Sequence, residues 1–85
     1  MSQLAARTLE LVDVPSESRR EDDLAALVRE IVPLELSYDR DLTLLFGAPR
    51  TGRPLVVLAG HLDTVPANGN LPGRIENGAV HGLGA

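Results

Sequence analysis

Apolar residues recur along the first third of the chain with the spacing of amphipathic helices. They return every three or four positions in residues 3–12 and again in residues 24–31. Ser2 precedes the first of these segments and is a candidate N-cap. Residues 18–21, SRRE, have the form of a capping box for the second segment, and Pro33 follows its last apolar residues. The pattern therefore predicts two helices.

After Pro33 the pattern changes to the period of β-strands. Apolar and polar residues alternate in residues 34–38, as in a half-buried strand. Residues 39–41, DRD, predict a turn that leads to a second strand at residues 42–46. Residues 55–59, LVVLA, are five successive apolar residues, which is typical of a strand buried on both faces of a sheet. We expect this segment to be the central strand of the fold.

A short hairpin is predicted near the end of the sequence. Asn77-Gly78 is a favoured two-residue turn and separates residues 74–76 from residues 79–81. Gly84 follows, where we expect the backbone to turn tightly with a positive φ. Two helices, short strands and one buried central strand together predict an α/β fold.

Composition limits the chemistry that this chain can perform. It has no cysteine, which excludes disulfides and a cysteine-ligated zinc, so any metal must be held by His, Asp or Glu. The formal charge of −4 argues against a nucleic-acid partner. The longest uncharged apolar run is far too short to span a membrane, and charged residues interrupt residues 1–14, which argues against a signal peptide. We therefore expect a cytoplasmic protein without a membrane or nucleic-acid partner.

The residues that suggest chemistry are His61 and Asp63, which follow the predicted central strand directly. Gly60 leaves room beside them, and open α/β sheets place their sites at such strand ends. In an extended backbone, side chains at i and i+2 point to the same side, so Asp63 can reach the His61 ring. A metal-bound histidine commonly donates its other ring N–H to a carboxylate. By itself, however, an H-x-D pair also occurs by chance, and a histidine at a strand end is often a surface or structural residue.

The wider sequence resembles a dinuclear zinc metallopeptidase family. The resemblance is carried by residues 58–66, LAGHLDTVP, followed by residues 80–85, VHGLGA. Residues 11–16, LVDVPS, also look like this family, and residues 70–72, NLP, look like its desuccinylase branch. The family contains succinyl-diaminopimelate desuccinylase, acetylornithine deacetylase and carboxypeptidase-type enzymes. The resemblance covers essentially the whole chain, and H-x-D-T-V-P is its most diagnostic element.

The resemblance implies a fold and a set of roles for these residues. Residues 1–85 would be the N-terminal part of a zinc-exopeptidase-like three-layer α/β/α catalytic domain, incomplete at its C-terminus. His61 would bind one of two zinc ions, for which cobalt can substitute, and Asp63 would be an active-site carboxylate. The bridging aspartate and the glutamate that acts as general base would lie beyond Ala85. The substrate would be a small N-acyl amino acid, and the whole enzyme would be a cytoplasmic homodimer.

Within that family, the resemblance favours N-succinyl-diaminopimelate as the substrate, cleaved to succinate and diaminopimelate in lysine biosynthesis. Acetylornithine or another acyl-amino acid is the alternative. His81 does not match a ligand of the family, so we expect it to have a structural role. An interpretation of another class is that the chain alone is a catalytically inert truncated fragment, because one histidine and one carboxylate cannot form a four-coordinate catalytic site.

Overall fold

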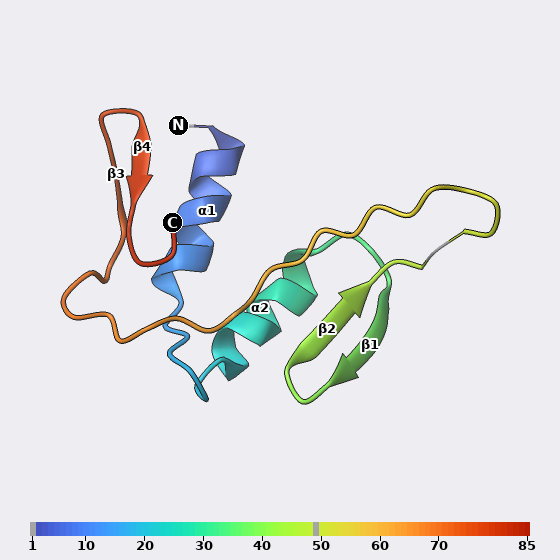
Figure 1. Cartoon of the computed structure of the whole chain (residues 1–85). Helices are drawn as coiled ribbons and strands as arrows, with labels where there is room; N and C mark the ends of the chain where they lie inside the picture. Colours follow the sequence, from blue (N-terminus) through green and yellow to red (C-terminus); the bar gives the residue numbers. More distant parts are fainter. Residues whose placement is uncertain (1, 49) are drawn as a thin grey trace.

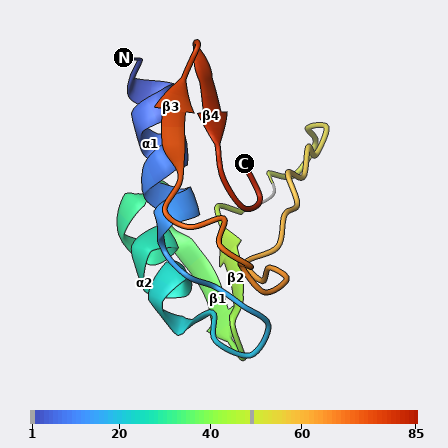
Figure 2. The same cartoon turned by 90° about the vertical axis from the view of Figure 1, so that its left-hand side faces the viewer.

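The chain folds into two helices and two β-hairpins. The computed structural model describes residues 2–48 and 50–85. Its elements are α1 Gln3–Asp13, α2 Asp22–Ile31, β1 Leu36–Arg40, β2 Thr43–Phe46, β3 Arg74–Glu76 and β4 Ala79–His81. Each hairpin is a separate two-stranded antiparallel sheet. Figures 1 and 2 both show β3 and β4 beside α1, with β1 and β2 at the other end near α2. The predicted combination of helices and strands is confirmed at this level.

Helix α1 is the helix that residues 3–12 predict, and it carries the second hairpin. Ser2 is its N-cap, with the hydroxyl oxygen accepting a hydrogen bond from the Ala5 N–H at 3.0 Å. At its other end, the Asp13 carboxylate accepts a hydrogen bond from the Gly73 N–H at 2.7 Å. Both β3 and β4 contact the helix. The cap and this long-range bond fix where α1 begins and where the hairpin docks.

Helix α2 begins at Asp22, directly after the residues of the predicted capping box. The prediction that these residues form a capping box is wrong. The N-cap is Glu21, which makes no side-chain capping hydrogen bond. Ser18 lies outside the helix, and its hydroxyl donates to Asp63. Arg19 has a positive φ of 73°, and its N–H donates to Glu21 Oε1 at 2.6 Å. The four residues therefore form a turn before the helix, whose first turn retains acidic residues favoured by the helix dipole.

The turn of the first hairpin lies later than residues 39–41 predict. β1 continues through Arg40, which pairs with Thr43 in β2. The two-residue loop is Asp41-Leu42, with φ values of 52° and 61°. Both central residues of a type I′ turn need positive φ, and its twist matches that of the flanking strands. Because strand pairing extends into the predicted turn, the loop shifts by one residue and includes a leucine, which turn propensities do not indicate.

The second hairpin agrees with its prediction. β3 and β4 occupy the predicted residues, and Arg74 pairs with His81. Asn77 and Gly78 form the loop with φ values of 52° and 75°. Gly84 also has the predicted positive φ, 77°. The Asn-Gly signal specified this element because both residues tolerate the left-handed region that the turn requires.

The predicted central strand at residues 55–59 is wrong for this structure. The segment has neither helix nor strand, and the side chains from Leu55 to Leu58 are 65–94% exposed. A strand needs neighbours for its backbone hydrogen bonds, and the described strands pair only within their own hairpins. No three-layer α/β/α arrangement is therefore formed by the described residues.

The core is correspondingly small. Among the described residues, Leu24 and Ala25 of α2 are the buried apolar residues. The predicted half-burial of residues 34–38 is wrong for Leu34 and Tyr38, which are 59% and 47% exposed, whereas Leu36 is partly buried. A bilayer crossing takes about 20 apolar residues, and neither described helix has that length and apolarity.

Candidate functional site

The His61 and Asp63 side chains lie against each other, as their i, i+2 spacing predicts. His61 Nδ1 is 3.2 Å from Asp63 Oδ1 and 2.9 Å from the Asp63 main-chain oxygen. The imidazole remains 82% exposed, whereas the Asp63 side chain is 48% exposed. The ring is thus held from one edge while its other edge faces outward.

This geometry determines which ring nitrogen can bind a metal. Both neighbours of Nδ1 are oxygen acceptors, so Nδ1 carries the hydrogen and donates it toward them. The remaining nitrogen, Nε2, then has a free lone pair, which is the form of histidine that ligates metals. The contact of Nδ1 with a carboxylate also matches the usual partner of a metal-bound histidine. His61 therefore fits zinc as a single ligand.

A full set of ligands is not assembled here. Within residues 2–48 and 50–85, no group of three His, Cys, Asp or Glu side chains is arranged to hold a metal ion. A catalytic zinc site takes three protein ligands and an open position. The described part of the chain therefore offers one histidine with a carboxylate partner, which is fewer than the ligands that a catalytic zinc site takes.

Asp63 has a second partner that the sequence did not indicate. Ser18 Oγ donates a hydrogen bond to Asp63 Oδ2 at 2.8 Å across 45 positions of sequence. The pKa of the Asp63 carboxyl lies below its ordinary value, chiefly because of this hydrogen bond; desolvation opposes the shift, and His61 adds to it. No local pattern links residues so far apart, so only the fold reveals Ser18.

Two hollows of the surface border the His61–Asp63 segment. One, of about 660 Å³, is shared with residues of α2 and of the β1–β2 hairpin. The other, of about 440 Å³, is shared with the end of α1 and with the loop that follows it. Gly60, His61, Leu62 and Asp63 line both. The pair is thus reachable from solvent, as a substrate-binding group has to be.

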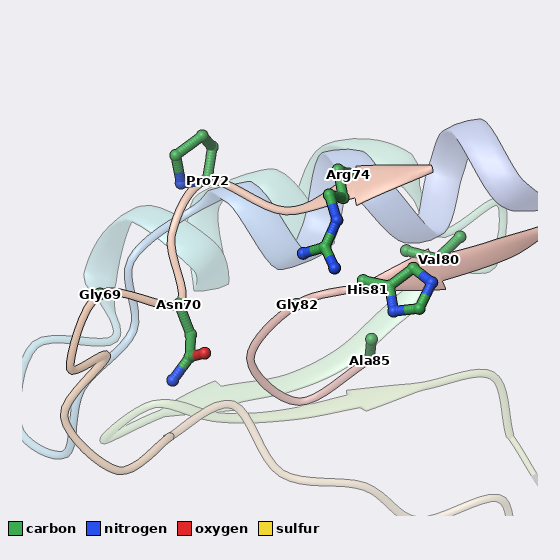
Figure 3. Close-up of a pocket in the computed structure, with 8 residues that line it drawn as sticks. All are labelled: Gly69, Asn70, Pro72, Arg74, Val80, His81, Gly82 and Ala85. Carbon is green, nitrogen blue, oxygen red and sulfur yellow. The ribbon is translucent and has the colours of Figure 1, made fainter. Parts of the chain in front are cut away.

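His81 lies in a different hollow, of about 440 Å³, which neither His61 nor Asp63 lines. Figure 3 shows its ring and the Arg74 guanidinium projecting from the two paired strands, with Asn70 on the loop before them. Arg74 Nε donates to Glu76 Oε2 at 2.7 Å, which offsets its charge. This hollow therefore presents no concentrated positive charge, and the structural role expected for His81 stays a prediction.

Curated proteins with similar sequences belong to the enzyme family that the sequence motifs resemble. A Mycobacterium tuberculosis protein assigned as a succinyl-diaminopimelate desuccinylase is 43% identical over 82 residues, which are 92% of this chain. The succinyl-diaminopimelate desuccinylase of Corynebacterium glutamicum is 39% identical over 83 residues, or 91% of the chain. The chain is related to the succinyl-diaminopimelate desuccinylases. This confirms the family resemblance that residues 58–66 and 80–85 predict.

The relationship is limited in extent. The chain spans 23% of the length of the M. tuberculosis relative and 22% of that from C. glutamicum. A Pyrococcus furiosus protein assigned as a LysW-lysine/LysW-ornithine hydrolase is also similar, at 36% identity over 77 residues. No family model matches the chain. No solved structure matches it either.

Proposed function

We propose that this desuccinylase-related chain contributes His61 and Asp63 to a zinc-dependent amidohydrolase acting on N-succinyl-diaminopimelate. The observation that carries the proposal is the Asp63 carboxylate beside His61 Nδ1, in a chain 43% identical to a protein assigned as that desuccinylase. Hydrolysis would break the amide C–N bond and release succinate and diaminopimelate, a step of lysine biosynthesis.

The two residues have distinct tasks in this proposal. His61 would bind zinc through Nε2, and Asp63 would hold the ring in the required tautomer and orientation. Zinc in such a site lowers the pKa of a bound water and polarises the carbonyl of the substrate. The remaining ligands and the general base are assigned to no residue of this chain. Two zinc ions, a homodimer and a cytoplasmic location complete the proposal.

The chain offers a matched control for the zinc assignment because it contains two histidines. In the complete polypeptide that carries this sequence, His61→Ala should lose about one zinc equivalent and nearly all hydrolysis of succinyl-diaminopimelate. His81→Ala should keep both. Asp63→Asn should retain most of the metal but lower kcat about 10- to 100-fold, because the imidazole loses its anionic partner.

Zinc content by elemental analysis and initial rates of succinate release measure these effects. Acetylornithine and a LysW-lysine conjugate should be poorer substrates by kcat/KM. If one of them is preferred, the substrate assignment is wrong although the zinc site stands. An His81→Ala protein that loses the metal while His61→Ala keeps it would refute the site itself.

A further inference from the structure

Ser18 hydrogen-bonds the His61–Asp63 pair from a distant part of the sequence. Its Oγ lies 2.8 Å from Asp63 Oδ2, while the other carboxylate oxygen, Oδ1, is 3.2 Å from His61 Nδ1. The carboxylate is thus held between a hydroxyl and an imidazole, one on each oxygen. Rotation of the Asp63 side chain would break both contacts.

The backbone around Ser18 is fastened to the same segment. Glu17 and Thr64 form an isolated parallel bridge. The Ser18 N–H donates to the Thr64 carbonyl at 3.2 Å, and the Thr64 N–H donates to the Ser16 carbonyl at 2.8 Å. In Figure 1 the segment that contains Thr64, in orange, passes the blue loop that joins α1 to α2. These backbone contacts place Ser18 beside the segment that carries Asp63.

Two other roles for the Ser18 hydroxyl do not agree with its contacts. It does not cap α2, because the N-cap is Glu21 and Ser18 lies three residues earlier. It is not arranged as a nucleophile either, since an activated serine gives its hydrogen to a histidine base, whereas this hydroxyl donates to a carboxylate. What remains is a hydrogen bond that orients Asp63.

We propose that Ser18 is a positioning residue, whose hydroxyl fixes Asp63 so that this carboxylate holds His61 Nδ1–H and leaves Nε2 for a metal. The inference rests on the proposed function for the identity of the metal as zinc. A carboxylate has about four lone-pair sites, and one donor on Oδ2 leaves Oδ1 free for the imidazole. A partner that hydrogen-bonds a metal ligand directly, as Asp63 does here, typically changes metal affinity or activity about 10- to 100-fold when removed. Ser18 acts one hydrogen bond further out, so we expect a smaller effect on removing its hydroxyl.

The test uses three variants of the complete polypeptide that carries this sequence. Ser18→Ala removes the hydroxyl, and Ser18→Thr keeps it. Ser37→Ala is the matched control, because the Ser37 hydroxyl is also exposed but donates to the Leu45 carbonyl, away from the site. The first readout is the tautomer of His61 in the metal-free protein, from the ring ¹⁵N shifts. The others are the zinc dissociation constant and the separate values of kcat and KM.

We expect the wild type, Ser18→Thr and Ser37→Ala to share the Nδ1–H tautomer of His61. Ser18→Ala should increase the share of the Nε2–H form of His61, while the Asp63 main-chain oxygen, 2.9 Å from Nδ1, still favours part of the Nδ1–H form. Zinc binding or kcat should fall by up to about 10-fold, less than in Asp63→Asn, with KM nearly unchanged. The proposal fails if Ser18→Ala has the wild-type tautomer, or if Ser18→Thr is as impaired as Ser18→Ala. A wild-type protein without zinc or desuccinylase activity would refute the proposed function instead, while the tautomer comparison would still decide the role of Ser18.

Discussion

At the residue scale, the sequence predicts contacts between side chains that are close in sequence but not those between side chains that are far apart. The spacing of His61 and Asp63 was enough to predict that the two side chains meet, because the backbone sets the direction of i and i+2. Ser18 was interpreted as a helix cap, since a serine three positions before a glutamate has that local use. Its hydroxyl bonds Asp63, 45 positions away, and only the fold could reveal that partner.

Glycines at the α1 interface are a second residue-scale feature that local patterns did not explain. Gly82 lies so close to α1 that a Cβ on it would clash with Val12 Cγ1. A Cβ on Gly73 would lie 2.9 Å from the same atom and from the His81 carbonyl oxygen. The hairpin can pack on α1 because these positions have no side chain.

The first prediction follows from this close packing. Gly82→Ala should destabilise the chain by about 1–3 kcal/mol, because Val12 or the hairpin backbone has to move to admit the methyl group. Gly60→Ala is the control, since its φ is not positive and nothing lies within 4 Å of the added Cβ. Urea unfolding followed by circular dichroism measures both. Equal stability of the two variants would mean that the hairpin is not packed on α1 as described.

At the element scale, a hairpin could be predicted where its turn residues are ones that favour positive φ. Asn77-Gly78 marks its own turn, and that hairpin has the predicted strands. Asp41-Leu42 has no such signal, so its hairpin was predicted with the turn too early. The apolar run at residues 55–59 has the composition of a buried strand, but composition does not supply the neighbouring strands that burial requires.

The second prediction concerns the link between α2 and β1. Arg29 Nε and Nη2 donate to the two Asp39 carboxylate oxygens at 2.8 and 2.9 Å, and this guanidinium holds the pKa of Asp39 below its ordinary value. A carboxyl with a lowered folded pKa adds stability above its unfolded pKa of about 3.9, and that stability is lost as pH falls through the folded pKa. Below about pH 4, the wild type should therefore lose stability that Asp39→Asn never had.

Unfolding free energies at several pH values between about 6 and 2.5 measure this loss. The difference between wild type and Asp39→Asn should be small, because both side chains are about one-third exposed, at 35% and 36%. Arg29→Gln should reduce the pH dependence in the same direction, and the double variant should add nothing to either single change. A wild-type profile parallel to that of Asp39→Asn would show that the pair does not form in solution.

At the scale of the whole molecule, the exposed surface area shows that the described chain is not a compact domain. The described chain exposes 6874 Å², whereas a compact protein of this mass exposes about 4,900 Å². Several large aliphatic residues are among those exposed, including Val56 at 81% and Leu58 at 94%. Hydrophobic patterning identified which residues favour burial, but it could not identify the surface that would cover them.

The last prediction combines this architecture with the chemistry of the site. We expect the purified 85-residue polypeptide to show no hydrolysis of succinyl-diaminopimelate, with zinc or cobalt added. His61 can supply one metal ligand, but the described residues bring together no group of three, and a catalytic zinc site takes three protein ligands and an open position for water. The assay is succinate release, with the desuccinylase of C. glutamicum as positive control and His61→Ala of the same 85 residues as background. Turnover above that background would mean that the chain completes a metal site by itself, through a rearrangement or by pairing with a second copy.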